Sequence, residues 1–251
     1  MVRKLHTIDL HMTRFNMKKD SARVKPEEFR AWNDKMVKKY DPDAFHHHSN
    51  PIIRFIEIKR VKAVLRLMDR GRKEDHVLEV GCGAGNILEE MPPMNLYGID
   101  ISDLVLSKAK EKLRENAVLL QSDAQSLPFK DQVFMQVVCS EVLEHLLDPS
   151  VALNEMTRVL KTQGVAVVSV PNESMINRIK SILIQLGIFK CLFQRKGSYS
   201  EMPERMEDEW HLHTFTLKEW IDLFKKLFKV TRVRKIPFPW IPLRYVVRLE
   251  K

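Results

Sequence analysis

The sequence of 251 residues has few cysteines and lacks any long apolar run. Its three cysteines, Cys82, Cys139 and Cys191, are too few and too scattered for a disulfide framework, so we expect a reducing, cytoplasmic location. No apolar segment reaches the ~18 residues that a membrane-spanning helix requires. Residues 1–20 carry charges and contain no apolar core of a secretory signal. These absences argue against a secreted protein and against an integral membrane protein.

The composition is that of an ordinary globular protein with an excess of positive charge. Hydrophobic residues make up 44% of the chain, which is enough for one sizeable core. The formal net charge is +9, and much of the excess lies in the first sixty residues and in residues 178–196. Nucleic acid, an anionic lipid or an acidic small molecule would fit this charge, and so would a merely solvated basic surface. Charge alone therefore does not identify the partner.

Glycine is scarce as well, and three of the eight glycines fall in one short segment, residues 77–85 (Val-Leu-Glu-Val-Gly-Cys-Gly-Ala-Gly). The pattern predicts a buried strand that ends in a sharp turn, where backbone amides come close to a ligand. Asp100 follows Gly81 by nineteen residues, at the end of a second apolar run, residues 96–99. An acidic residue at the tip of the neighbouring strand binds a ribose diol in doubly wound nucleotide-binding folds.

Two phosphate-binding loops are excluded by what this turn lacks. A dinucleotide fingerprint has its third glycine at the sixth position, which is Asn86 here, and a P-loop ends in Gly-Lys-Ser/Thr, which is absent. The turn carries no positive side chain, and Glu79 precedes it. The segment therefore suits a ligand that has an adenosine and an amine but no phosphate.

Taken together, these segments resemble the class I S-adenosylmethionine-dependent methyltransferases over roughly residues 52–170. Residues 121–129 (Gln-Ser-Asp-Ala-Gln-Ser-Leu-Pro-Phe) resemble the family segment that reads the adenine, and residues 133–146 resemble its fourth strand and the following helix. Residues 159–170 resemble the fifth strand, although Thr162-Gln163 replaces the usual Pro-Gly and puts the turn geometry in doubt. The Glu-x-x-Glu-His grouping that starts at Glu141 resembles ubiquinone-type O-methyltransferases.

The resemblance and the alternation of strands and helices predict an α/β fold. We expect a doubly wound, seven-stranded, mostly parallel, Rossmann-like sheet whose last strand is antiparallel. Residues 1–70 should form an N-terminal helical cap, and residues 71–251 the cofactor-binding domain, with a helical lid insert after the fifth strand at residues 172–215. Apolar spacing and helix-capping signals predict helices at 26–39, 52–69 ended by a left-handed Gly71, 104–115 capped by Ser102, 149–160 and 216–228, and late strands at 228–234 and 245–249.

The resemblance implies that S-adenosylmethionine is the methyl donor and S-adenosylhomocysteine the product. The residues expected to bind it are Glu79, Gly81, Cys82, Gly83, Gly85, Asp100, Ile101, Asp123, Ala124 and Ser140.

Methyl transfer from a sulfonium needs mainly the positioning of an acceptor, and a general base helps when the acceptor is a hydroxyl. Glu141, Glu144 and His145 would share one face of a helix, and His213 could approach from residues 210–215. We assign Glu141, His145 and His213 as catalytic. Three other roles stay open: Glu141 as a helix cap, His145 as a structural histidine, and the cluster as a divalent-metal site, although no metal is assigned.

Several substrate classes are disfavoured by missing motifs. Residues 139–142 (Cys-Ser-Glu-Val) lack the Asn/Asp-Pro-Pro-Tyr/Phe segment of nucleic-acid amino methylation, and Cys139 lacks the preceding proline of cytosine-carbon chemistry, so DNA is not expected. The apolar residues of 172–196 favour O-methylation of a small or lipid-like acceptor. The same basic, amphipathic segment predicts peripheral membrane contact through residues 177–196, unless it is only a lid helix. A tRNA-modifying enzyme and a catalytically silent cofactor-binding scaffold are the alternatives.

Overall fold

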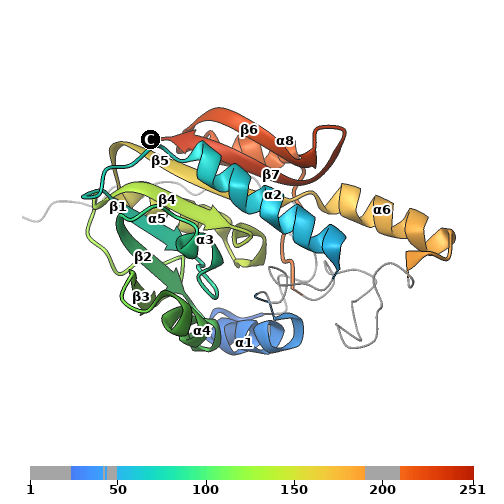
Figure 1. Cartoon of the computed structure of the whole chain (residues 1–251), viewed down its shortest axis with the longest axis horizontal. Coiled ribbons are helices and arrows are strands. Elements are labelled where there is room, and N and C mark those ends of the chain that lie inside the picture. Colours follow the sequence, from blue (N-terminus) through green and yellow to red (C-terminus); the bar gives the residue numbers. More distant parts are fainter. Residues whose placement is uncertain (1–23, 42, 44–49, 190–209) are drawn as a thin grey trace, which may run out of the picture.

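The computed structural model describes residues 24–41, 43, 50–189 and 210–251. Within them the chain forms one seven-stranded sheet with the strand order β3-β2-β1-β4-β5-β7-β6 (Figure 1). β7 pairs antiparallel with both β5 and β6, while the neighbouring pairs from β3 to β5 are parallel. The predicted mostly parallel sheet with an antiparallel last strand is therefore confirmed. The strands are β1 (His76–Val80), β2 (Asn95–Asp100), β3 (Ala117–Gln121), β4 (Phe134–Ser140), β5 (Leu160–Pro171), β6 (Lys229–Phe238) and β7 (Ile241–Glu250).

Helices cover both faces of the sheet because side chains that alternate along each central strand are apolar on both sides. In β4, Val137 and Cys139 belong to the core under α5 and α8, whereas Val138 belongs to the core under α2, α3 and α4. No helix in the described ranges has the length and apolar character needed to cross a membrane. The α-helices are α1 (Phe29–Tyr40), α2 (Pro51–Leu67), α3 (Asn86–Glu89), α4 (Asp103–Leu113), α5 (Pro149–Val159), α6 (Glu173–Gln185) and α8 (Leu217–Phe224).

The two helices before β1 are built into the fold in different ways. α2 packs on the sheet, since Val64 lies in the same core as Val246 of β7, and Arg248 of β7 donates a hydrogen bond to the Leu67 carbonyl at 2.7 Å. α1 lies instead beside α4, and Tyr40 at its end stacks on Trp210 with ring centroids 5.6 Å apart. α1 thus lies next to α4 and apart from the face of the sheet on which α2 packs (Figure 1).

Two expected helix ends differ from the structure. α2 ends at Leu67 and its C-cap residue Met68 is extended, so the helix stops before Gly71, whose φ is not positive. Gly71 is needed for space instead, because a Cβ there would overlap the Met94 sulfur. Ser102 stands at the N-cap of α4, but its hydroxyl makes no capping bond and donates to Asp34 of α1 at 2.5 Å. Tertiary contacts, which spacing along the chain does not reveal, decided both positions.

Candidate active site

A cavity of about 350 Å³ lies at the carboxyl ends of β1, β2 and β4. Parallel strands end at one edge of a sheet, which is where doubly wound folds bind ligands. α1, α2, α6 and residues 210–211 contribute the other walls. The cavity has two halves: one is formed by the glycine turn and β2, and the other by the segment after β4, the inner sides of α2 and α6, and the start of β7.

The glycine turn has the backbone conformation that its composition predicts. Gly81 has φ +70°, its amide donates to the Ile99 carbonyl at 2.8 Å, and a Cβ there would overlap the Val142 side chain. Gly83 has φ +52°, and a Cβ there would meet nothing within 4 Å. Gly83 thus borders open cavity space, where a ligand can approach the bare backbone.

Asp100 lies at the tip of β2 and is anchored on the glycine turn. Its Oδ2 accepts a hydrogen bond from the Gly83 amide at 3.0 Å, and its Oδ1 accepts one from the Ser102 amide at 2.9 Å. Burial raises the pKa of Asp100 to about 6, although these two amides act in the opposite direction. The carboxylate is therefore fixed in place, and its remaining lone pairs can accept the two hydroxyls of a ribose.

Glu79, at the carboxyl-terminal part of β1, is a buried carboxylate with unused hydrogen-bonding capacity. Its exposed fraction is 2%, and Oε2 has no hydrogen-bond partner among the described residues. Burial raises the pKa of Glu79 to about 8, while the charge of Arg60 lowers it. A ligand ammonium group would satisfy this oxygen and favour the ionised form. The amine of S-adenosylmethionine fits such a position.

The other expected cofactor residues are placed on the same half of the cavity, with one exception. Ile101, Asp123 and Ala124 line the cavity, as do Cys82 and Ser140. Gly85 does not line it. Gly85 has φ +77° at the N-cap of α3, and a Cβ there would lie 2.7 Å from the side chain of Leu113, so this glycine serves local turning and packing.

Glu141 does not lie on a helix with Glu144 and His145, so the predicted common helical face is wrong. Glu141 has φ +57°, and only Leu143–His145 forms a short 3-10 helix. The Glu141 carboxylate accepts a hydrogen bond from Ser169 at 2.8 Å and forms an ion pair with Arg244. Because β5 and β7 supply these partners, the chain turns sharply after β4 instead of continuing as a helix.

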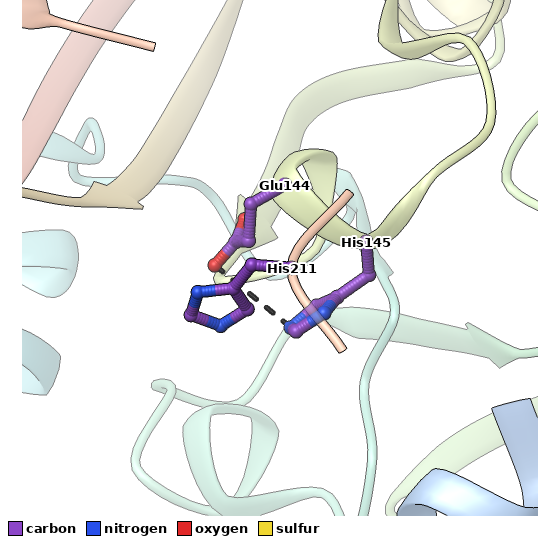
Figure 2. Close-up of side chains that lie close together, drawn as sticks. All are labelled: Glu144, His145 and His211. Atoms are coloured by element: carbon purple, nitrogen blue, oxygen red, sulfur yellow. Dashed lines mark ion pairs between the residues drawn. The ribbon is translucent and has the colours of Figure 1, made fainter. Parts of the chain in front are cut away.

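Glu144, His145 and His211 lie close together and line the other half of the cavity (Figure 2). One ligand atom from each of the three lies within 4.8 Å of those from the other two. The Glu144 side chain is 1% exposed, and neither of its carboxylate oxygens has a hydrogen-bond partner in the described part of the chain. Burial, with the nearby charge of Glu141, raises the pKa of Glu144 well above its usual value. An orphaned buried carboxylate is costly unless something binds it.

Both histidines have their Nδ1 atoms directed at other groups. His145 Nδ1 lies 3.2 Å from the Trp210 carbonyl and must donate to it, which leaves Nε2 with a free lone pair 4.0 Å from Glu144 Oε1. His211 Nδ1 lies 2.6 Å from Glu173 Oε1. Burial and the neighbouring His211 lower the pKa of His145 well below its usual value, so the ring is neutral near pH 7.

His213, the third expected catalytic residue, is placed differently. Its exposed fraction is 4%, its Nε2 donates to the Leu146 carbonyl at 2.8 Å, and it does not line the cavity. Its role is to hold the segment after Trp210 against the loop after β4, where the amides of Leu212 and His213 also donate to the Glu144 carbonyl. We therefore leave His213 out of the proposed mechanism.

A buried charged network joins the two halves of the cavity. Arg60 of α2 pairs with Glu57 at 2.7 Å and also donates to the Ser140 hydroxyl, which lies 2.8 Å from the Ser169 hydroxyl. Ser169 continues the network to Glu141 and hence to Arg244. The network holds Ser140 between the two halves of the cavity. We call the half with the glycine turn and β2 the cofactor half, and the half with Glu144, His145 and His211 the acceptor half.

The acceptor half also has an apolar wall. It is formed by Ile53 and Ile56 of α2 facing Ile176, Ile179 and Leu183 of α6. The lining of this half thus combines a polar cluster with aliphatic side chains. An acceptor with a polar head and an apolar body would match both parts.

Comparison with known proteins agrees with this geometry. Residues 78–168 match the family model of the methyltransferase domain. Over these residues, about a third of the chain, the sequence is similar to that family. The matched segment includes the glycine turn, Asp100 and the Glu144–His145 pair.

Curated relatives share sequence with the methyltransferase domain over part of their length. The chain is 38% identical over 138 residues to demethylmenaquinone methyltransferase of Staphylococcus aureus (strain JH9), covering 52% of this chain and 54% of that protein. It is 31% identical over 138 residues to an uncharacterised protein of Methanocaldococcus jannaschii, covering 54% and 59% respectively. The chain therefore spans between half and three fifths of the length of these two relatives.

Solved structures share the fold of the methyltransferase domain over most of the chain. The N-methyltransferase NodS of Bradyrhizobium japonicum WM9 in complex with S-adenosyl-L-homocysteine aligns with a TM-score of 0.61 and 16% identity, over 88% of this chain and 98% of its own. A SAM-dependent methyltransferase of Thermotoga maritima aligns with a TM-score of 0.61 and 20% identity, over 89% and 99%. The chain therefore has the Rossmann-like class I methyltransferase fold. The ubiquinone-type subfamily stays a prediction.

Sequence reasoning missed several residues that shape the acceptor half. Arg60, Arg244 and Glu173 look like ordinary surface charges of a helix or strand. His211 lies in residues 210–215, from which only His213 was expected to approach the site. The available signal for Arg60 was its position three residues after Glu57 on α2, the spacing at which two opposite charges can pair and be buried together. Nothing in the sequence places Arg244 or Glu173 at the cavity.

Proposed function

We propose that this chain transfers a methyl group from S-adenosylmethionine to an oxygen of a small or lipid-like acceptor. The observation that carries the proposal is one cavity whose lining includes the buried carboxylate of Glu79, the half-buried carboxylate of Asp100, a polar cluster and an aliphatic wall. The S-adenosylhomocysteine in the related NodS structure supports the choice of donor. The related demethylmenaquinone methyltransferase supports an acceptor with an apolar part.

On this proposal the chain's own residues bind, orient and deprotonate. When bound, S-adenosylmethionine supplies a methyl group attached to a sulfonium sulfur, and this sulfur is the leaving group. Asp100 accepts hydrogen bonds from the ribose, and Glu79 neutralises the amine. His145, neutral and with Nε2 free, accepts the proton of the acceptor hydroxyl as its oxygen bonds to the methyl group, and then releases that proton to solvent. The thioether product leaves with the electron pair of the broken carbon–sulfur bond.

The test is transfer of label. Incubation of the chain with S-adenosylmethionine labelled in the methyl group, together with separated lipid, small-metabolite and tRNA fractions, should label the lipid or small-metabolite fraction. Label in tRNA, with binding that weakens steeply as salt rises through counterion release, would support the tRNA alternative instead. Donor binding without label in any fraction would support the silent scaffold.

A divalent cation at Glu144, His145 and His211 is a second candidate feature of the site. The unpartnered Glu144 carboxylate favours it. The contacts of the histidines also favour it, because metal-binding imidazoles usually direct their other ring nitrogen at a carbonyl or carboxylate, as His145 does at Trp210 and His211 at Glu173. A bound cation would lower the pKa of a coordinated acceptor hydroxyl.

Calorimetric titration of the metal-free chain with Mn²⁺ or Zn²⁺ should show one site, and His211→Ala, which removes one ligand, should weaken it by at least the roughly 10- to 100-fold that loss of an outer-shell partner costs. His76→Ala is the matched control, since His76 stacks on Tyr97 and does not line the cavity. Equal titration curves for the two variants, or no heat with the wild type, would rule out this site. Turnover that survives chelation leaves His145 as the base without a metal.

A further inference from the structure

Aromatic residues gather on the surface where the amino end of α2 meets the β6–β7 turn. The rings of Phe55 and Phe238 lie 6.1 Å apart, and the ring of Trp240 stacks on Phe238 at 5.3 Å. Trp240 is 72% exposed, and the two phenylalanines about 40%. Burial in the fold does not account for three neighbouring aromatic side chains that stay this exposed.

α6 extends this apolar surface from the cavity outward. Ile179 and Leu183 line the cavity, and Ile182 and Leu186, at helical spacing beside them, are 47% and 64% exposed. In Figure 1 the carboxyl-terminal half of α6, the amino end of α2 and the β6–β7 turn all lie at the right-hand end of the molecule. An apolar stripe thus runs from the acceptor half of the cavity to the exposed end of α6.

The charge around this surface is of one sign. Arg54 and Lys59 of α2 and Lys235 of β6 are exposed, and Lys59 lies over the Phe55 ring at 5.4 Å. The only carboxylates within α2, α6 and β6 are Glu57 and Glu173, and both are buried. These three elements therefore present exposed cations and no exposed carboxylate.

We propose that this surface docks on an anionic lipid bilayer. We call it the aromatic end surface; it comprises Ile52, Phe55, Ile182, Leu186, Phe238, Trp240 and Ile241. Interfacial aromatic and aliphatic side chains flanked by lysine and arginine are what an acidic headgroup layer binds. Docking would place the apolar wall of the cavity next to the bilayer, from which a lipid-like acceptor enters; that last step rests on the proposed function.

The proposal widens the membrane contact beyond the segment predicted from sequence, residues 177–196. Of that segment, Ile182 and Leu186 at the end of α6 contribute, and residues 190–196 lie outside the described residues. α2 and the β6–β7 turn were not expected to take part. Spacing along the sequence could not predict that these elements lie together, because α2 and β6 are more than 150 residues apart in the chain.

The experiment is co-sedimentation of the full chain with vesicles of phosphatidylcholine alone and of phosphatidylcholine mixed with phosphatidylglycerol. The wild type should bind the mixed vesicles, bind the neutral ones weakly, and lose affinity as salt rises. Trp240→Ser should weaken binding about tenfold through loss of apolar burial, and Lys235→Glu about 30-fold through reversal of a charge near the headgroups.

Matched controls lie elsewhere on the molecule. Val118 on the edge strand β3 is 50% exposed, and Lys110 on α4 is exposed. Val118→Ser removes an exposed apolar side chain and Lys110→Glu reverses an exposed charge, both away from the proposed surface, so both variants should bind like the wild type. Failure of the wild type to bind mixed vesicles, or equal losses in the control variants, would overturn the proposal. Vesicle binding without methyl transfer would refute only the proposed function, and methyl transfer without vesicle binding only this surface.

Discussion

Replacing Asp100 with alanine is expected to weaken the binding of S-adenosylmethionine and of S-adenosylhomocysteine by about 10²- to 10⁴-fold. Two hydrogen bonds from ribose hydroxyls to a charged acceptor contribute about 1.5–3 kcal/mol each, and the variant loses both. It also loses the bond that fixes the Gly83 amide. Calorimetric titration with S-adenosylhomocysteine measures the effect without any acceptor.

The control for this variant is Asp103→Ala. Asp103 lies three residues away, its side chain is 63% exposed, and it does not line the cavity, so its loss should change affinity little. An Asp100→Ala chain that stays folded and binds the product like the wild type would refute the assignment of Asp100 to the ribose.

The affinity of the wild type for S-adenosylhomocysteine should also depend on pH, through the ionisation of Asp100. Burial raises the pKa of Asp100 to about 6, so protonation as the pH falls through 6 removes the acceptor, and affinity should fall by up to about tenfold per unit below it. Burial raises the pKa of Glu79 to about 8, so affinity should also fall in a separate step as the pH drops through 8 and Glu79 is protonated. Glu79→Gln removes that step and leaves the one that belongs to Asp100.

His145→Ala is expected to slow turnover by about 10²- to 10⁴-fold while leaving the affinity for S-adenosylhomocysteine unchanged. The reason is that His145 faces Glu144 and the acceptor half of the cavity, whereas Glu79, Asp100 and the glycine turn form the other half. Single-turnover transfer of labelled methyl to the accepting fraction measures the rate, and product titration measures the affinity.

His76→Ala again serves as the control and should affect neither quantity. Normal turnover in His145→Ala would show that positioning of the acceptor alone is sufficient. A loss of product affinity equal to the loss of rate would mean that the histidine supports the fold of the site and not the chemistry.

The sheet and the cofactor half could be predicted from sequence because they depend on short-range patterns. The apolar strand, its glycines and Asp100 stand close together in the chain, and the alternation of strands and helices predicts a mostly parallel sheet. Nine of the ten expected cofactor residues line the cavity; Gly85 alone is used for packing.

The acceptor half could not be predicted to the same extent because its residues come together only through tertiary contacts. Helical spacing placed Glu141 beside Glu144, but Arg244, about a hundred residues later, pairs with Glu141, and the backbone turns there. His211 takes its place next to Glu144 and His145. A spacing of three and four residues places side chains on one face only where the chain forms a helix, and residues 141–145 do not form one continuous helix.

The hydrogen bond from Ser102 to Asp34 has a consequence for how the site is assembled. The amide of Ser102 donates to Asp100, while its hydroxyl donates to Asp34 of α1, whose residues Phe29 and Asn33 border the cavity. One residue thus connects the ribose-binding carboxylate to the helix that covers it. Loading of the nucleoside and docking of α1 are then thermodynamically linked, and the coupling free energy with which each favours the other is the same in both directions.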